Sequence, residues 1–158
     1  MRALLQRVSY AHVSVDNEVI STIGNGLLIL VGIHKSDAAV DGGWIIRKVL
    51  SARIFEDESG KMGRSIVDIG GEILIVSQFT LYGEMRKGTR PDFSDSMAGS
   101  LAREFYNQWV ADFRKACSLT LREGRFAATM KVQSVNEGPV TLMLDSRQPH
   151  QITTPATH

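Results

Sequence analysis

The feature that most constrains the fold is a series of short apolar segments, each ended by a turn signal. Apolar residues recur at near-alternate positions over residues 2–15, Asp16-Asn17 gives a turn, and a second extended segment covers residues 18–23. Alternation with a period of two is typical of a strand with one buried face. The pair therefore predicts a β-hairpin, and an apolar strand over residues 27–33 follows it.

Two longer segments have apolar residues at helical spacing. The first covers residues 38–50, and Asp37 precedes it as a candidate N-cap. The second covers residues 96–116, where four apolar residues at intervals of four predict a buried stripe along one helix face. These four residues are Leu101, Phe105, Trp109 and Phe113.

The remaining strands are short. We predict one at residues 53–55 and one at residues 72–76, which delivers Ser77 at its end. The C-terminal part predicts an extended segment over residues 126–135 and a strand over residues 140–144. The turn Asn136-Glu137-Gly138-Pro139 lies between them, so these two segments predict a second hairpin with Gly-Pro at its tip.

Several hairpins and two helices, without regular strand-helix alternation, indicate an α+β fold. We expect a single domain with a mainly antiparallel, barrel-like β-sheet and two helices, since 158 residues suit one core. The domain should cover residues 1–145. Beyond it the composition changes to Gln, Thr, Pro and His without periodicity, so residues 146–158 are expected to form a flexible C-terminal tail.

Composition excludes several classes of protein. The longest apolar run, at residues 27–31, is far too short to span a bilayer, and the N-terminus lacks the apolar core of a secretory signal, so we expect a cytoplasmic protein and no membrane association. The single cysteine, Cys117, excludes an internal disulfide and fits a buried structural role. Since the net charge is only +1, a nucleic acid would have to be bound by a local basic patch.

The common catalytic side chains do not form a recognisable constellation. A hydrolytic triad needs a histidine beside a nucleophile, and the sequence offers no clear nucleophile partner for the histidines at positions 12, 34, 150 and 158. The acidic run Glu56-Asp57-Glu58 lacks the ligand spacing of a calcium loop and is typical of a solvated turn. We therefore predict no metal and no cofactor, and expect any enzyme activity to depend on backbone groups or on the substrate itself.

Two segments carry unusual local chemistry. Ser77-Gln78-Phe79-Thr80 places two hydroxyls, an amide and an aromatic ring at the end of a buried strand, from which a rigid sheet can aim them at a ligand. The ordinary alternative is a polar strand end that satisfies nearby backbone groups. Gly138-Pro139 is, by the same ordinary interpretation, only a turn.

Together, SQFTL at residues 77–81 and NEGPVT at residues 136–141 resemble the two signature motifs of the D-aminoacyl-tRNA deacylase family. The joint match, in order and about 60 residues apart, is specific. The resemblance extends over most of the chain, from ALLQRV at residues 3–8 to GRFAA at residues 124–128, and only the tail lies outside it.

The resemblance implies a cytoplasmic homodimer that hydrolyses the ester between a D-amino acid and the 3′-terminal adenosine of tRNA. It implies a cis Gly138-Pro139 bond whose turn enters the site of the other subunit, where its carbonyl oxygens exclude an L-side chain. Such a filter does not reject glycine, so Gly-tRNA, including mischarged Gly-tRNA(Ala), is an expected substrate.

The resemblance also implies roles for other residues. Arg7 steadies the Gly138-Pro139 turn, with a surface charge as the alternative. Phe126 stacks on the terminal adenine, with a core phenylalanine as the alternative. A further expectation comes from the residues themselves: the loop after the first motif carries the cations Arg86, Lys87 and Arg90, which contact tRNA phosphates or, alternatively, only face solvent.

Two questions stay open at the level of sequence. In the first mechanism, backbone N–H groups near Phe79 and Thr80, with Gln78 or Ser77, hold the oxyanion while the 2′-hydroxyl of the ribose activates water. In the second, Thr80 acts as a nucleophile.

The function also has two alternatives. The chain could be a relative with a trans Gly-Pro bond that acts on mischarged L-aminoacyl-tRNA, or a dimeric RNA-binding module without catalysis.

Overall fold

The structure is a computed structural model and describes residues 1–86 and 88–147 of the chain. No helix of this described part is long and apolar enough to cross a membrane. The elements, in chain order, are β1 (Arg2–Val15), β2 (Glu18–Ile23), β3 (Gly26–Gly32), α1 (Ala39–Ser51), β4 (Phe55–Glu56), β5 (Met62–Arg64), β6 (Glu72–Ser77), the 3₁₀ helix η1 (Phe79–Tyr82), α2 (Gly99–Ala116), β7 (Leu121–Glu123) and β8 (Lys131–Asp145).

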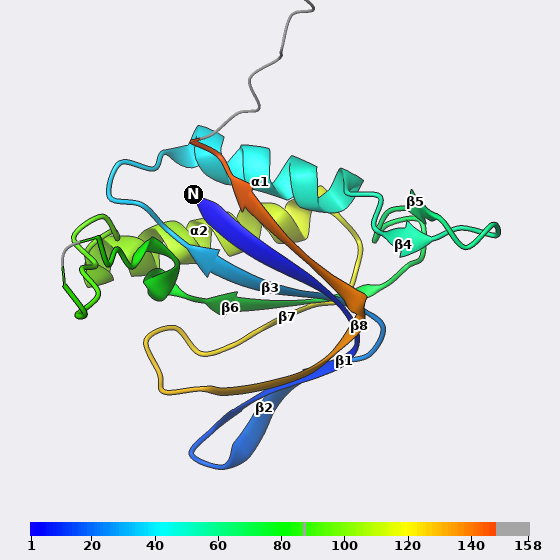
Figure 1. Ribbon diagram of the computed structural model, residues 1–158, viewed down its shortest axis with the longest axis horizontal. Coiled ribbons are helices and arrows are strands. Elements are labelled where there is room, and N and C mark those ends of the chain that lie inside the picture. Colours follow the sequence, from blue (N-terminus) through cyan, green and yellow to red (C-terminus); the bar gives the residue numbers. More distant parts are fainter. Residues whose placement is uncertain (87, 148–158) are drawn as a thin grey trace, which may run out of the picture.

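The long strand β1 organises the main sheet. Along one edge it pairs with β8 from Arg2 opposite Asp145 to Ser14 opposite Lys131. Along its other edge β3 pairs with the first half of β1, and β2 pairs with the second half. All three pairings are antiparallel, and the sheet curves so that β2 and the adjoining part of β8 bend away from the helices (Figure 1).

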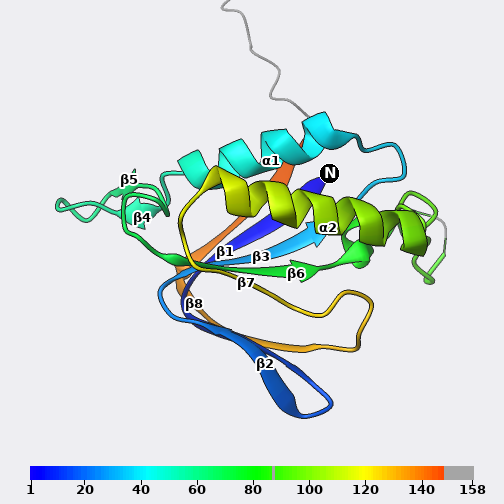
Figure 2. The same ribbon diagram turned by 180° about the vertical axis from the view of Figure 1, so that it is seen from behind.

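The other side of the sheet is parallel. β3 pairs with β6, and β6 pairs with the short β7. The predicted α+β, mainly antiparallel and barrel-like fold with two α-helices is confirmed, whereas these two parallel pairings were not predicted. Helices α1 and α2 cover one face of the sheet (Figures 1 and 2).

Strands β3 and β6 are buried on both faces, which explains their unbroken apolar sequences. On β3, Leu27 and Ile29 belong to the core beneath the helices, whereas Leu28 belongs to a second core inside the curved sheet. On β6, Ile75 and Leu74 divide between the two cores in the same way. This double burial makes β6 a rigid support for the residues that follow it.

The helices differ from their predicted forms in two details. Helix α2 begins at Gly99, and Leu101 is 59% exposed, so the predicted stripe starts one turn too early. The buried face is completed instead by Ala102, Tyr106 and Val110. Asp37 does not cap α1, because its carboxylate accepts hydrogen bonds from the Met1 ammonium and the His34 N–H.

The predicted C-terminal hairpin is wrong. The segment before residue 131 forms turns, and β8 is one strand that stays paired with β1 on both sides of Gly138-Pro139. The register changes between Gln6 opposite Thr141 and Val8 opposite Asn136, so several residues bulge out opposite Arg7. Local turn chemistry predicted a reversal, whereas the long partner strand keeps the chain in the sheet.

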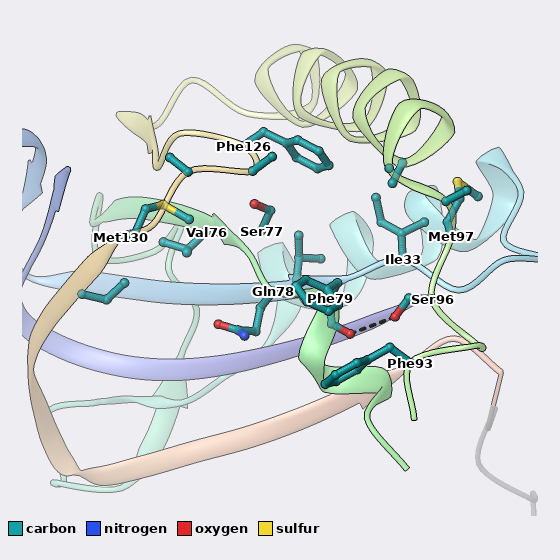
Figure 3. A pocket seen from close by; sticks show the side chains of 17 residues that line it. Ile33, Val76, Ser77, Gln78, Phe79, Phe93, Ser96, Met97, Phe126 and Met130 are labelled. Atoms are coloured by element: carbon teal, nitrogen blue, oxygen red, sulfur yellow. Dashed lines mark hydrogen bonds between the residues drawn. The ribbon is translucent and has the colours of Figure 1, made fainter. Parts of the chain in front are cut away.

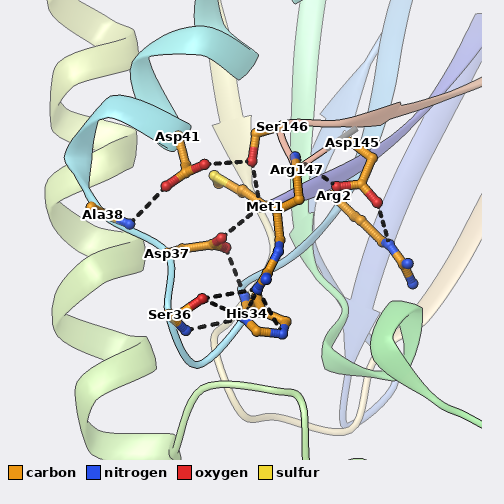
Figure 4. A network of polar contacts seen from close by, with 10 residues as sticks. All are labelled: Met1, Arg2, His34, Ser36, Asp37, Ala38, Asp41, Asp145, Ser146 and Arg147. Atoms are coloured by element: carbon orange, nitrogen blue, oxygen red, sulfur yellow. Dashed lines mark hydrogen bonds and ion pairs between the residues drawn. The ribbon is translucent and has the colours of Figure 1, made fainter. Parts of the chain in front are cut away.

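A polar network joins the start of β1 to the end of β8 (Figure 4). The Met1 ammonium donates to the Ser146 hydroxyl at 2.6 Å, and that hydroxyl donates to Asp41 at 2.7 Å. Arg147 contacts the ring of His34 and the Ser36 hydroxyl. Ser146 and Arg147, the first residues of the predicted tail, thus contact the domain, while residues 148–158 lie outside the described part.

Candidate active site

The polar segment after β6 begins where two strands end together. Ser77 lies opposite Val31, and the Gln78 N–H donates to the Val31 carbonyl at 2.7 Å. The chain then leaves the sheet and forms η1. The rigid end of β6 thus determines where the Ser77 and Gln78 side chains lie.

A cavity of about 690 Å³ opens at this strand end, between β6, the start of α2 and the loop before β8 (Figure 3). Its lining is apolar apart from Ser77, Gln78 and Ser96, and no ionisable side chain belongs to it among the described residues. Cavities of this size accommodate small-molecule ligands. The other lining residues are Val31, Ile33, Val76, Phe79, Phe93, Met97, Ala98, Gly99, Ala102, Phe126, Ala127, Ala128, Met130 and Val132.

The first turn of η1 presents backbone donors. Its hydrogen bonds begin with the Leu81 N–H, which donates to the Gln78 carbonyl at 3.2 Å. The N–H groups of Phe79 and Thr80 precede this bond, and neither donates to a backbone carbonyl within the described part of the chain. A carbonyl oxygen of a ligand can therefore take them as partners.

The side chain of Thr80 is exposed and does not line the cavity. Its hydroxyl accepts a hydrogen bond from the Gln78 amide. The neighbouring Phe79 side chain is 59% exposed and packs edge to face against Phe93 at 5.0 Å between ring centres. Of the four predicted residues, Ser77, Gln78 and Phe79 thus line the cavity, and Thr80 stands beside it.

Phe126 forms part of the opposite wall of the cavity (Figure 3). Its ring lies 5.3 Å from that of Tyr106, which belongs to the core beneath the helices. The guanidinium carbon of Arg103 lies 4.9 Å from the centre of the same ring, at the distance of a cation–π contact. Phe126 therefore packs on the core and also faces the cavity.

The Gly138-Pro139 bond is cis and lies in the exposed bulge of β8. The Asn136 side chain closes this bulge, because it accepts from the Val140 N–H at 3.0 Å and donates to the Thr141 hydroxyl at 2.8 Å. Neither Gly138 nor Pro139 lines the cavity of its own chain.

Arg7 is buried beneath the bulge. Its Nε donates to the Glu137 carbonyl at 3.0 Å, and its Nη1 donates to the Ile54 carbonyl at 2.8 Å. A Cβ on Gly138 would lie 2.8 Å from Arg7 Nη2. Arg7 is thus in direct contact with the Gly138 segment and is not a surface charge.

The sheet keeps the two signature segments of one chain apart. Arg7 lies opposite Leu27, whereas Ser77 lies opposite Val31, and β1 and β3 separate β8 from β6. With a rise of ~3.3 Å per residue and ~4.8 Å between strands, the bulge and the cavity lie roughly 20 Å apart.

The predicted basic loop lies between η1 and α2. Arg86 and Arg90 are exposed, and Arg86 forms an ion pair with Glu84 at 3.1 Å. Lys87 lies outside the described residues. Ser96 and Met130 also line the cavity but were not predicted, because neither belongs to a motif and each comes from a loop far from Ser77 in sequence.

Tyr82 anchors the end of η1 beneath the site. Its ring lies 4.6 Å from the Arg2 guanidinium and 5.2 Å from the ring of His34. Burial raises the pKa of its phenol, and the nearby Asp37 and Asp145 carboxylates raise it further. Arg2 also donates to the Leu81 carbonyl at 2.8 Å, so both residues hold the last turn of η1.

Comparison with known proteins agrees with this arrangement. Residues 4–145 match the family model of D-Tyr-tRNA(Tyr) deacylase. The D-aminoacyl-tRNA deacylase of Chromobacterium violaceum is 49% identical over 149 residues, which cover 94% of this chain and 99% of the relative. That of Thermosipho melanesiensis is 47% identical, with the same coverage of both proteins.

Solved structures share the fold. A protein described as c-Myc DNA unwinding element binding protein superposes with a TM-score of 0.88 at 43% identity, covering 92% of this chain and 98% of its own. A probable eukaryotic D-amino acid tRNA deacylase superposes with a TM-score of 0.76 at 21% identity, covering 90% and 97%. Because a family model matches most of the sequence and close relatives span almost all of it, the chain belongs to the D-Tyr-tRNA(Tyr) deacylase family.

Proposed function

We propose that this protein removes D-amino acids from tRNA in the cytoplasm by hydrolysing the ester to the 3′-terminal adenosine. Membership of the family makes the chain a hydrolase of aminoacyl-tRNA. The observation that carries the proposal is a cavity with no ionisable side chain among its described lining residues, next to the Phe79 and Thr80 N–H groups, which donate to no backbone carbonyl in the described part of the chain. Such a site can hold an aminoacyl ester without a charged anchor for the side chain.

The chemical step then depends on preorganised donors. The Phe79 and Thr80 N–H groups hold the oxygen that becomes negative when water attacks the ester carbonyl. The bond from the carbonyl carbon to the ribose 3′-oxygen breaks, and a proton from the water passes to that oxygen. Because the described lining has no carboxylate or imidazole, we assign activation of the water to the neighbouring 2′-hydroxyl of the ribose.

Chiral selection requires Gly138-Pro139 of a second subunit. Within one chain the bulge and the cavity lie roughly 20 Å apart, so the carbonyl oxygens of the bulge reach a cavity only from a partner molecule. The edge of β8 supplies a surface for this dimer. It is a long strand with exposed apolar side chains at Val135, Leu142 and Met143, and exposed strand edges favour pairing with another chain.

The filter acts by exclusion. In the dimer, the carbonyl oxygens of the bulge occupy the space that an L-side chain needs, whereas a D-side chain points away from them. A clash of ~4 to 6 kcal/mol would give a discrimination of ~10³ to 10⁴. Glycine carries no side chain to clash, so Gly-tRNA, including mischarged Gly-tRNA(Ala), is a substrate of the same site.

Binding of the tRNA end uses one wall of the cavity, the basic loop between η1 and α2, and the bulge of β8. Phe126 presents a ring on which the terminal adenine can stack, worth ~1 to 3 kcal/mol per base. The exposed Arg86 and Arg90 and the neighbouring Lys87 attract the acceptor-stem phosphates. Arg7 holds the bulge in place through the Glu137 carbonyl.

The direct test compares hydrolysis of D-Tyr-tRNA, L-Tyr-tRNA and Gly-tRNA by the purified protein. We expect D-Tyr-tRNA and Gly-tRNA to be cleaved. Cleavage of L-Tyr-tRNA should be slower by a factor of at least ~10³. Comparable rates for the two tyrosyl enantiomers would rule out the filter. A protein that binds all three without cleavage would not be a deacylase.

Two further measurements separate the mechanisms. A tRNA that ends in 2′-deoxyadenosine lacks the hydroxyl that we assign to water activation, so its D-aminoacyl ester should be cleaved very slowly. Thr80→Ala should retain most of the wild-type kcat, because the Thr80 backbone, and not its hydroxyl, meets the oxyanion. Loss of activity in Thr80→Ala with normal cleavage of the deoxy substrate would instead identify a threonine nucleophile.

Nucleic-acid binding without catalysis is the second candidate. It is favoured by one relative of known structure, 43% identical, which is described as a DNA unwinding element binding protein. Duplex binding does not explain a cavity whose described lining has no ionisable side chain and which lies next to the Phe79 and Thr80 N–H groups. Tight binding of duplex DNA or tRNA with no ester hydrolysis would support this candidate.

A further inference from the structure

Ser96 contacts the site from outside both signature segments. Its hydroxyl donates to the Phe79 carbonyl at 3.0 Å, and the residue lines the cavity (Figure 3). The surrounding backbone holds Ser96 in place. Its own N–H donates to the Phe93 carbonyl at 2.9 Å, and the next N–H, of Met97, donates to Ile33 at 2.9 Å.

The contact fixes the direction of a second group. The Phe79 carbonyl and the Thr80 N–H belong to one peptide unit, which is planar and trans, so they point in opposite directions. A donor that holds the carbonyl on one side therefore sets the direction of the N–H on the other side. Donation to the carbonyl also polarises the peptide and makes the N–H a stronger donor.

We propose that Ser96 is a positioning residue for the hydrolytic reaction and aims the Thr80 N–H at the developing oxyanion by holding the Phe79 carbonyl. This inference rests on the proposed function, in which that N–H is an oxyanion donor. Such a donor is effective only when it is directed in advance at the place where charge develops. The hydroxyl itself takes no part in bond making.

The experiment compares three variants with the wild-type protein on D-Tyr-tRNA. Ser96→Ala removes the hydroxyl, Ser96→Thr retains it, and Ser94→Ala is the control, because Ser94 contributes only backbone groups to the hydrogen bonds of the described residues. Steady-state kinetics with substrate in excess give kcat and KM, urea unfolding gives stability, and ¹⁵N-edited NMR follows the Thr80 amide proton.

We expect Ser96→Ala to lower kcat about fivefold and to change KM less than about twofold. A change of this size corresponds to the loss of one hydrogen bond that stabilises the transition state more than the bound substrate. Its Thr80 amide signal should move upfield, since the polarising donor is gone. Ser96→Thr should restore both, and Ser94→Ala should change neither. A uniform loss of stability cannot produce this split between kcat and KM.

The proposal is overturned if Ser96→Ala keeps the wild-type kcat, if its KM rises alone, or if Ser96→Thr is as slow as Ser96→Ala. An unchanged Thr80 amide signal in Ser96→Ala also overturns it. Failure of the proposed function has a different signature, because the wild-type protein itself then leaves D-Tyr-tRNA intact.

Discussion

At the scale of single residues, Arg7 is the side chain that we expect to support the Gly138 bulge. It is 7% exposed and donates to two carbonyls on different segments, those of Glu137 and Ile54. Arg7→Ala leaves both acceptors without this donor, so we expect the free energy of unfolding to fall by about 2 kcal/mol. Urea denaturation measures the change.

The control for this prediction is Arg122→Ala, which removes an exposed arginine from β7. Surface substitutions of this kind change stability by about 0.5 kcal/mol or less. Equal unfolding midpoints for the two variants would show that Arg7 does not support the bulge.

His34 makes the stability of the protein depend on pH. Burial lowers the pKa of its imidazole below 6.5, and the Arg147 guanidinium lowers it further. The unfolded chain therefore takes up a proton at a higher pH than the folded chain. Stability is complete above about pH 6.5 and falls as the pH drops below this value towards the folded pKa.

The measurement is urea unfolding between pH 5 and pH 8 for the wild-type protein and His34→Gln. We expect the wild-type midpoint to decrease below about pH 6.5 and the midpoint of the variant to change less over the same interval. Parallel curves would show that another group causes the dependence.

At the scale of elements, sequence predicted best where the signal is local. The apolar runs of β3 and β6 and the helical spacing of α2 depend on neighbours a few residues away, and all three elements were found. The course of β8 was mispredicted because Gly138-Pro139 resembles a hairpin tip, whereas its pairing depends on Gln6 and Val8 at the other end of the chain. Local chemistry does not encode such a partner.

The edge of β8 is the element for which we predict self-association. Leu142 is 42% exposed on this strand, and a lysine there places a charge on the proposed dimer surface. We expect Leu142→Lys to sediment as a monomer at concentrations where the wild-type protein is a dimer. Val40→Lys, which changes a 73% exposed residue of α1, should leave the dimer intact. A dimeric Leu142→Lys protein would place the interface elsewhere.

At the scale of the whole molecule, the sequence predicted only some of the residues that line the cavity. The motif residues Ser77 to Phe79 do line the cavity, but the opposite wall comes from α2 and from the loop before β8. Those segments contribute ordinary residues such as Ala102 and Met130, which have no recognisable pattern. The distance between the two signature segments likewise depends on the order of the strands in the sheet, which local sequence patterns do not encode.

A mixing experiment tests whether the bulge acts across subunits. Ala128→Trp should block the cavity of one chain while its bulge stays intact. Gly138→Val should damage the bulge, because a Cβ there lies 2.8 Å from Val140 Cγ2 and the backbone has a φ of 122°. Its own cavity stays open.

Each variant alone should lack D-specific hydrolysis. Mixed dimers join the open cavity of one chain to the intact bulge of the other, so refolding the two together should restore preference for D-Tyr-tRNA over L-Tyr-tRNA. No recovery in a mixture shown to contain heterodimers would mean that the bulge serves its own chain.

The pairing of β1 with β8 has a consequence for synthesis of the protein. Arg2 and Asp145 are hydrogen-bonded neighbours, yet they are 143 residues apart in sequence. At ~5 to 20 residues per second, a ribosome needs on the order of ten seconds to make the intervening chain. Throughout that time the earliest strand has one edge without its partner, and such high contact order slows folding. The nascent chain is therefore most exposed to misassembly along the edge that β8 later occupies.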